Sequence, residues 1–89
     1  LLLARFGRVR ADVVQTCEIY RGRRILTRRL VRDFHRAGIA VHVWTINEVE
    51  DMERLLDWEV DGLVTDRPDR LAGVLHRRYG RPLPPALAR

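Results

Sequence analysis

Short apolar runs rich in β-branched residues alternate along this sequence with segments of helical periodicity, and this alternation restricts the fold more than any other feature. Residues 39–46 (IAVHVWTI) form the longest run, which is typical of a strand covered on both faces in a parallel sheet. Residues 11–15 and 60–65 predict two further short buried strands. Because a helical pattern follows each run, we expect an α/β fold in which helices cover a parallel sheet.

The first helix has clear signals at both ends. Thr27 is a favourable N-cap residue, and apolar residues then recur at helical spacing. Gly38 stands where a left-handed C-terminal cap is favoured. These signals predict a helix over residues 28–37, preceded by an Arg-rich loop over residues 16–24 that turns at Gly22.

The second and third helices are also expected to start at capping residues. Asn47 is the expected N-cap of the second helix, and Glu50 would return the hydrogen bond as a capping box. Acidic residues over 48–53 suit the positive end of a helix dipole, which explains them without a metal site. Asp66 and Pro68 are expected to open the third helix.

The chain is short for the sheet that it encodes. Three strands in 89 residues would leave both outer strands as bare apolar edges. We therefore expect residues 1–78 to belong to a larger domain, followed by a Pro/Arg-rich tail at residues 79–89. The sequence starts at Leu1 rather than Met, so we expect its natural N-terminus to be missing; the compartment stays open, with the cytoplasm favoured.

Composition excludes several classes of chemistry. The chain has 17 Arg but no Lys or Ser, so a serine nucleophile and a lysine Schiff base are excluded. One cysteine, Cys17, cannot form an internal disulfide or a thiolate zinc site, and we expect it to be buried. No apolar run approaches the roughly 20 residues of a membrane span.

The net charge of +5 divides into +7 over residues 1–46, −7 over 47–69 and +5 over 70–89. This division favours solvated helix faces and a basic tail over a nucleic-acid site, since few aromatic residues lie near the arginines. Nucleic-acid binding through the arginines is kept as one alternative, but we expect no nucleic-acid partner.

Two motifs and the helix between them resemble one enzyme family. The motifs are residues 41–47 (VHVWTIN) and residues 60–68 (VDGLVTDRP), with residues 52–56 (MERLL) between them. They resemble the C-terminal signature of the glycerophosphodiester phosphodiesterase family, and the resemblance runs over about residues 11–76. Residues 14–15 (VQ), Gly22 and residues 25–27 (ILT) are similar to the strand and loop that precede those motifs.

The resemblance implies a (β/α)8 TIM barrel of which this chain supplies the last three strand–helix units. It implies a metal-dependent phosphoric diester hydrolase of lipid metabolism, which cleaves glycerophosphodiesters to an alcohol and glycerol 3-phosphate with Mg²⁺ or Ca²⁺. The family's catalytic His residues and metal ligands come from earlier strands. No catalytic or metal-binding residue is therefore expected in this chain, which we expect to be inactive alone; its histidines, His35, His42 and His76, lie in none of those contexts.

Trp44 and Gln15 are the expected substrate-binding residues of this chain. Each lies near the carboxyl end of a predicted strand, where barrel active sites are built. The resemblance implies that Trp44 forms a wall of the substrate pocket; the alternative is a core Trp. Gln15 would point into the barrel mouth or anchor a loop. Function is also considered for Asn47 and for Thr65 with Asp66, but capping explains Asn47 and Asp66.

Three further expectations concern single residues. His42 alternates with Trp44, so it should share the face of Trp44 and be buried. The other two histidines are expected at the surface. Glu59 stands where the family usually has Gly, so it would strain the turn before residue 60 by roughly 1 kcal/mol if the backbone is kept.

One alternative comes from a different functional class. The same fold can serve as a non-catalytic remnant or interaction module that pairs through its exposed sheet edges. In that case the partner would be another chain or a second copy, and the isolated fragment could self-associate.

Overall fold

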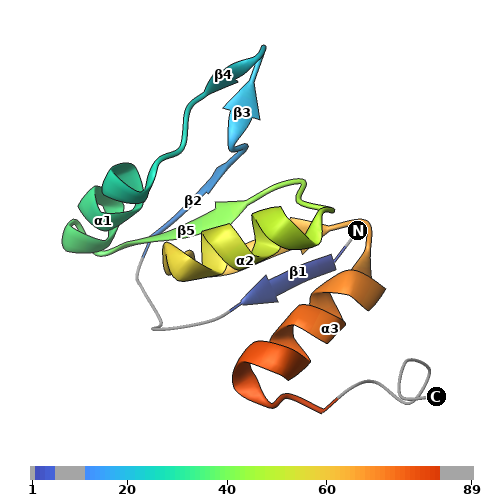
Figure 1. Cartoon of the computed structure of the whole chain (residues 1–89). Coiled ribbons are helices and arrows are strands. Elements are labelled where there is room, and N and C mark those ends of the chain that lie inside the picture. The colour runs from blue at the N-terminus through green and yellow to red at the C-terminus, as the bar shows by residue number, and fades with distance from the viewer. Residues whose placement is uncertain (1, 6–11, 83–89) are drawn as a thin grey trace.

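The computed structural model describes residues 2–5 and 12–82, with side chains described from residue 12 onward (Figure 1). Strands come first along the chain, and then helices alternate with strands. The elements are β1 (Leu2–Arg5), β2 (Asp12–Thr16), β3 (Ile19–Tyr20), β4 (Arg23–Arg24), α1 (Arg28–Arg36), β5 (Ile39–Val43), α2 (Val49–Asp57), β6 (Gly62–Thr65) and α3 (Pro68–Tyr79).

The main sheet has the strand order β1-β6-β5-β2. β2, β5 and β6 are parallel, with Val14 opposite Val41 and Val43 opposite Leu63, which confirms the three predicted strands and their direction. β1 was not predicted, and it runs antiparallel to β6. The expectation of a purely parallel sheet is therefore wrong at this edge, where pairing with β1 satisfies backbone groups of β6 that would otherwise be bare.

β2 is an edge strand and not the buried strand that its composition predicted. Within the described residues it pairs with β5 alone, and Asp12, Val13 and Gln15 are exposed. An apolar run shows that a strand can be buried, but burial also requires neighbours on both sides. Cys17, just past β2, is half-buried and not buried as expected.

The segment predicted as an Arg-rich loop forms a second, two-stranded sheet. β3 and β4 pair antiparallel, with Tyr20 opposite Arg23. The two residues between them, Arg21 and Gly22, have φ angles of 50° and 76°. Positive φ at both central positions is the geometry of the turn that suits a two-residue hairpin, so the predicted turn at Gly22 is confirmed but the loop is a hairpin.

A single apolar core lies between the three helices and one face of the parallel strands. Val41, Val43 and Leu63 supply the sheet side of this core. The helices contribute buried side chains at helical spacing, namely Val31, Met52, Leu55, Leu56, Leu71, Val74 and Leu75. α3 therefore buries the stripe that its periodicity predicted, and α2 buries most of it. α1 buries Val31, covers Leu30 and Phe34 in part, and leaves Ala37 exposed.

The ends of α1 are as predicted. The Thr27 hydroxyl accepts a hydrogen bond from the Leu30 N–H at 3.2 Å, and Gly38 has a φ of 76°. The starts of α2 and α3 differ from prediction. Their N-cap residues are Glu48 and Arg67, and neither cap residue makes a side-chain capping bond. α3 continues to Tyr79, and residues 83–89 of the predicted tail lie outside the described residues.

A buried polar contact joins the amino ends of β5 and β6. Asp61 is 4% exposed, and one of its carboxylate oxygens accepts from the Val41 N–H at 2.8 Å and lies 2.7 Å from His35 Nε2. His35 is therefore half-buried, not at the surface as expected, because it faces this carboxylate from the last turn of α1. His76 is exposed as predicted.

The turn that leads into this contact keeps a backbone that favours glycine. Glu59 has a φ of 64°, which an L-residue with a side chain adopts only at a cost. The expectation of a strained Glu59 is confirmed.

Candidate functional site

The carboxyl ends of β2, β5 and β6 meet at one edge of the sheet, because the three strands are parallel and adjacent. Two backbone hydrogen bonds hold the segment after β5 against its neighbours. The Trp44 N–H donates to the Thr16 carbonyl at 3.0 Å, and the Ile46 N–H donates to the Val64 carbonyl at 2.9 Å. This carboxyl-end edge is where an α/β sheet builds its binding sites.

Trp44 lies at this edge, immediately after β5, and its side chain is 45% exposed. In the described chain Trp44 is therefore at the surface, and its role as a pocket wall stays a prediction. His42 is 2% exposed, so its predicted burial is confirmed. The two side chains do not share an environment as expected, because β5 ends at Val43 and the strand alternation stops there.

Gln15 lies in register with His42 on the neighbouring strand. Paired residues on adjacent strands extend from the same face of a sheet, so Gln15 is on the face opposite the helix-covered core. Its side chain is exposed, one residue before the carboxyl end of β2. The structure thus places Gln15 near the end of β2 and Trp44 just past the end of the adjacent β5, and their roles toward substrate stay predictions.

Asn47 connects two loops of this edge and does not cap α2. Its side-chain oxygen accepts from the Thr65 hydroxyl at 3.1 Å and from the Asp66 N–H at 2.9 Å. Because this oxygen is already engaged across the sheet, it is not turned toward the first turn of α2, and that helix begins only at Val49. The predicted capping box with Glu50 is therefore wrong.

Thr65, and not Asp66, orders the loop that leads into α3. The Thr65 side chain is fully buried, and its hydroxyl accepts from the Arg67 N–H at 2.9 Å. Asp66 is exposed and the helix starts one residue later than a cap at Asp66 would require. The loop between β6 and α3 is thus held from within by Thr65 and from the neighbouring loop by Asn47.

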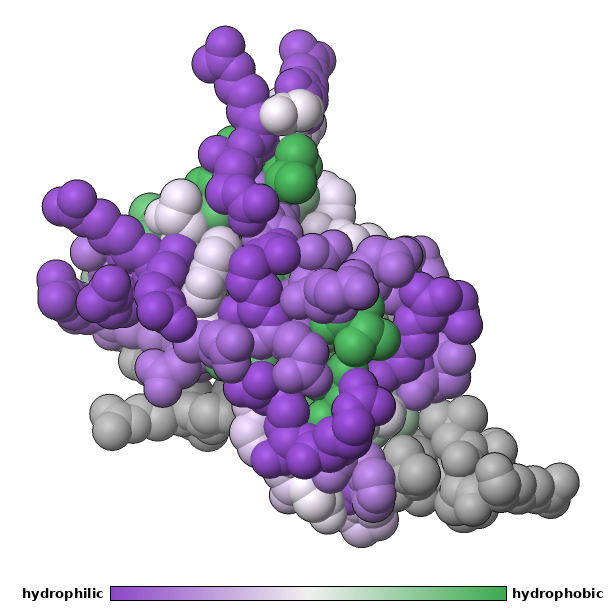
Figure 2. Space-filling model, in the orientation of Figure 1, coloured by the Kyte–Doolittle hydropathy of each residue, from purple (hydrophilic) through white to green (hydrophobic). Residues whose placement is uncertain are grey.

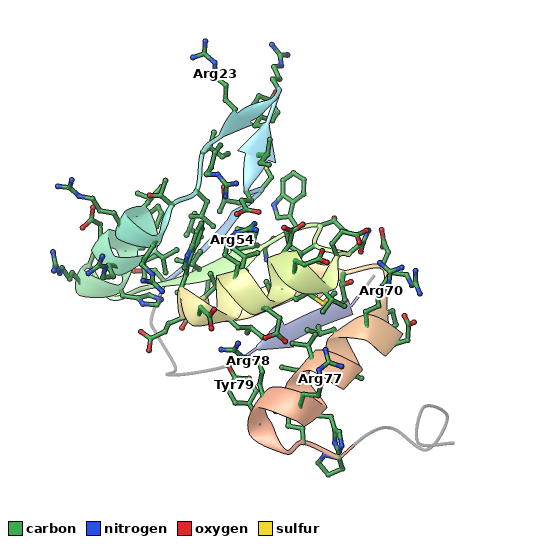
Figure 3. All side chains as sticks on the ribbon, viewed as in Figure 1. Arg23, Arg54, Arg70, Arg77, Arg78 and Tyr79 are labelled. Atoms are coloured by element: carbon green, nitrogen blue, oxygen red, sulfur yellow. The ribbon has the colours of Figure 1, made fainter. Side chains whose placement is uncertain are left out.

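The two arginines beside this loop are paired with acids. Arg70 donates to the Asn47 carbonyl at 3.0 Å and to Glu48 at 3.3 Å (Figure 3). Arg67 donates twice to Asp69, and this hydrogen bonding lowers the pKa of the Asp69 carboxyl and raises the pKa of the Arg67 guanidinium. Both guanidinium groups beside the loop are therefore engaged in ion pairs, so they are not available as two unpaired groups to bind an anion.

Glu18 is a residue that sequence reasoning did not single out. It is 5% exposed, and its carboxylate accepts from Arg24 of β4 at 2.6 Å and from Arg54 of α2 at 2.5 Å. Partial burial opposes the charge of Arg54, but hydrogen bonds to Glu18 and Asp51 outweigh it and raise the Arg54 pKa. Glu18 thereby ties the hairpin to α2. Its only sequence signal is an acid two residues after β2 within an Arg-rich segment.

Three of the four acids of α2 are engaged by arginines. Arg78 of α3 donates to Glu53 at 2.9 Å and to Asp57 at 2.8 Å (Figure 3), and Asp51 pairs with Arg54 at 2.9 Å. Among residues 2–5 and 12–82, no three His, Cys, Asp or Glu side chains are gathered in a way that could hold a metal ion. The residues present therefore do not fit a complete metal site. In the same part of the chain, every helix is too short or too polar to cross a bilayer.

Comparison with known proteins gives one consistent family. The model of the glycerophosphoryl diester phosphodiesterase family matches residues 5–70. The chain is 46% identical over 67 residues to a protein of Mycobacterium tuberculosis named probable glycerophosphodiester phosphodiesterase 2, which covers 75% of the chain and 25% of that relative. It is 43% identical over 44 residues to a glycerophosphodiester phosphodiesterase of Bacillus subtilis, which covers 49% of the chain and 15% of that relative.

A third relative, a glycerophosphodiester phosphodiesterase of Caldanaerobacter subterraneus, is 35% identical over 48 residues, which cover 54% of the chain and 20% of the relative. The chain therefore spans a quarter or less of the length of the curated relatives that it matches. No solved structure matches it.

Proposed function

Because the chain belongs to the glycerophosphoryl diester phosphodiesterase family, we propose that the whole protein is a phosphoric diester hydrolase of lipid metabolism. Its substrates are glycerophosphodiesters, and its products are an alcohol and glycerol 3-phosphate. The observation that carries this proposal is the family match over residues 5–70, which includes the three parallel strands and the loops at their carboxyl ends.

We infer that residues 1–78 form the last part of a (β/α)8 barrel, with β2–α1, β5–α2 and β6–α3 as its final three units. The parallel order of these strands and the helix after each one support this assignment. A whole barrel takes about 250 residues, which agrees with relatives several times as long as their matched segments. In a closed barrel, the edge of β6 that β1 occupies here would pair with the first barrel strand.

In that barrel, Trp44 and Gln15 would line the substrate pocket. The exposed indole of Trp44 offers an apolar face and one N–H donor, which suit the glycerol or alcohol part of a diester. The Gln15 amide can donate to a hydroxyl or phosphoryl oxygen from the adjacent strand. Asn47 and Thr65 would position the two loops beside them without touching substrate.

The chemical step belongs to residues outside this chain. The family's divalent ion, Mg²⁺ or Ca²⁺, would polarise the phosphoryl oxygens, with ligands and general acid–base residues supplied by earlier strands. The described residues offer no set of three metal ligands, so no step is assigned to this chain beyond substrate contact. The 89-residue chain alone is therefore expected to be inactive.

The test is hydrolysis of glycerophosphocholine by the whole protein with added Mg²⁺ or Ca²⁺, followed as release of glycerol 3-phosphate. Trp44→Ala should lower kcat/KM about tenfold or more, because an aromatic contact contributes roughly 1.5 kcal/mol or more to substrate binding. Gln15→Ala should have a smaller effect. Tyr79→Ala is the matched control, since Tyr79 is 52% exposed on α3, outside the carboxyl-end edge.

Equal activity of Trp44→Ala and Tyr79→Ala would contradict the pocket assignment. Hydrolysis by the 89-residue chain alone would contradict the placement of the chemistry. A whole protein that hydrolyses no glycerophosphodiester with either metal would contradict the enzyme and favour a non-catalytic member of the family.

A further inference from the structure

The hairpin β3–β4 projects from the body of the molecule at the carboxyl-end edge (Figure 1). It follows β2 after two residues and turns through Arg21 and Gly22, which leaves its tip at the far end from the core. Its backbone is regular, with Ile19 opposite Arg24 and Tyr20 opposite Arg23. The hairpin is therefore a narrow, ordered projection that presents few residues.

Those residues combine exposed apolar and cationic side chains. Ile19 is 53% exposed and Tyr20 is 55% exposed, although both are of types usually covered in a folded chain. Arg21 and Arg23 are exposed beside them, and the Arg21 guanidinium lies 5.4 Å from the centre of the Tyr20 ring. Figure 2 shows hydrophilic side chains reaching out from the tip, with hydrophobic ones on the stem below.

The same chemistry continues around the base of the hairpin. Ile25 and Trp44 are both more than two-fifths exposed, and Trp44 is hydrogen-bonded through its N–H to the Thr16 carbonyl where the hairpin segment begins. The next element along the chain adds exposed arginines on its outer face, which are Arg28, Arg29, Arg32 and Arg36. Positive charge therefore surrounds an exposed apolar and aromatic group.

The acid of this segment does not oppose that charge at the surface. Glu18 is buried, and its carboxylate is held by Arg24 and Arg54. Its carbonyl also accepts from the Ile25 N–H at 2.9 Å, which closes the base of the hairpin. The projection is thus fixed before any partner arrives, so binding would not require ordering it.

We propose that the hairpin forms an attachment site for the surface of a bilayer that contains anionic phospholipid. Arg21 and Arg23 would meet lipid phosphates, while Ile19 and Tyr20 enter the zone between headgroups and acyl chains. Aromatic side chains with one polar atom favour that zone, and arginine side chains extend from it toward water. The exposed arginines of α1 add long-range attraction to the negative surface.

A fluid lipid surface suits this projection better than an acidic protein surface. Carboxylates of a protein would pair with the arginines but would leave isolated apolar side chains on a narrow hairpin without a matching pocket. A bilayer interface accepts apolar side chains at any position along it. The proposal goes beyond the proposed phosphodiesterase activity and is measured without any hydrolysis.

The test is co-sedimentation of the 89-residue chain with vesicles of phosphatidylcholine, with or without phosphatidylglycerol. Binding should require the anionic lipid and weaken as salt is raised. Arg23→Glu should lower the partition coefficient about tenfold or more, because it replaces an attracted charge with a repelled one. Arg77→Glu, on the exposed part of α3, is the matched control with the same change of charge and should lower it by about twofold or less.

A second readout follows the apolar part of the site. The chain has two Trp residues, so Tyr20→Trp in a Trp44→Phe and Trp58→Phe background places a single Trp on the hairpin. Its emission should shift to shorter wavelength on anionic vesicles, and Tyr20→Ser in the natural background should weaken binding without any change of charge. Far-UV circular dichroism checks that each variant is folded.

Equal losses for Arg23→Glu and Arg77→Glu would overturn the proposal. So would binding that follows charge alone, with no shift of the Trp emission at position 20 and no loss in Tyr20→Ser. That second outcome would instead indicate an acidic macromolecular partner for the same arginines.

Discussion

At the amino ends of β5 and β6 the polar groups are buried and paired, whereas at the carboxyl ends of β2 and β5 large side chains stand exposed. Asp61 is 4% exposed and engages both the Val41 N–H and His35. At the other end Trp44 is 45% exposed, and the hairpin projects beside it. The two ends of the same strands therefore differ in burial: polar groups are buried and paired at the amino ends, and large side chains are exposed at the carboxyl ends.

The amino ends of these strands therefore contribute to stability, and the carboxyl ends carry side chains that are available for binding. A buried carboxylate with hydrogen-bond partners is costly to disturb, since its removal leaves polar groups without partners in a dry environment. Exposed side chains on loops can change at little cost to folding, which leaves them free for binding. The carboxyl-end edge also has internal supports, Glu18 and Asn47, which hold its loops without occupying its surface.

The largest effect on stability is expected from Asp61→Ala at the amino-end edge. It should lower the free energy of unfolding by about 3 kcal/mol, because the Val41 N–H loses a charged acceptor while buried. Urea denaturation followed by circular dichroism measures this change. Asp61→Asn keeps an oxygen acceptor and should cost clearly less; equal costs for the two variants would show that the hydrogen bond is not the source.

Glu18→Ala should cost about 2 kcal/mol, less than Asp61→Ala, because Arg24 and Arg54 remain partly solvated after the acid is removed. Hydrogen exchange should become faster at the Ile25 amide, which bonds to the Glu18 carbonyl at the hairpin base. Asp51→Ala removes another partner of Arg54 at an exposed position and should cost under about 1 kcal/mol. A larger cost for Asp51→Ala would contradict the assigned importance of Glu18.

Asn47→Ala should cost about 1 to 2 kcal/mol, since the Asp66 N–H and the Thr65 hydroxyl lose their shared acceptor. Asn47→Ser separates this role from helix capping. Serine is a good N-cap residue but its side chain is too short to reach across to the β6–α3 loop. Thermal unfolding of Asn47→Ser should therefore match that of Asn47→Ala, and recovery of stability would restore the capping interpretation.

Glu59→Gly should give the smallest change and the only gain, raising the free energy of unfolding by about 1 kcal/mol. Glycine adopts the observed positive φ without the steric cost that Glu59 carries. Glu59→Ala is the control, because it removes the charge but keeps the cost of a Cβ atom, and it should give little gain. A loss of stability in Glu59→Gly would mean that the Glu59 side chain contributes more than its backbone strain costs.

Much of the helix-covered side was predictable from the sequence. Periodicity located most of the buried helix residues, and Thr27 and Gly38 marked the ends of α1. These features depend on neighbours a few residues away, which a linear pattern records. The glycine-type position at Glu59 was indicated by the family resemblance. The carboxyl-end edge was less predictable, because the partners of Glu18 and Asn47 lie 36 and 19 residues further along the chain.

The predictions that were wrong failed for the same reason, which is that contacts between distant segments decide the outcome. Asn47 and Asp66 are both good capping residues by type, yet the Asn47 oxygen binds a loop that only the parallel pairing of β5 and β6 brings near. β2 has a buried-type sequence but lies at an edge, and β1 pairs with β6 from the opposite end of the chain. Local preference sets what a residue can do, and long-range contacts then select among these possibilities.

The amino-acid pattern is sufficient to predict the alternation of strands and helices, most of the buried helix residues and the family to which the chain belongs. Only the folded chain shows that Glu18 is buried between two arginines, that His35 meets Asp61, and that Trp44 is exposed while His42 is not. Apolar periodicity is a local property of the chain. The burial of a charge or an aromatic ring depends on which distant segments arrive beside it.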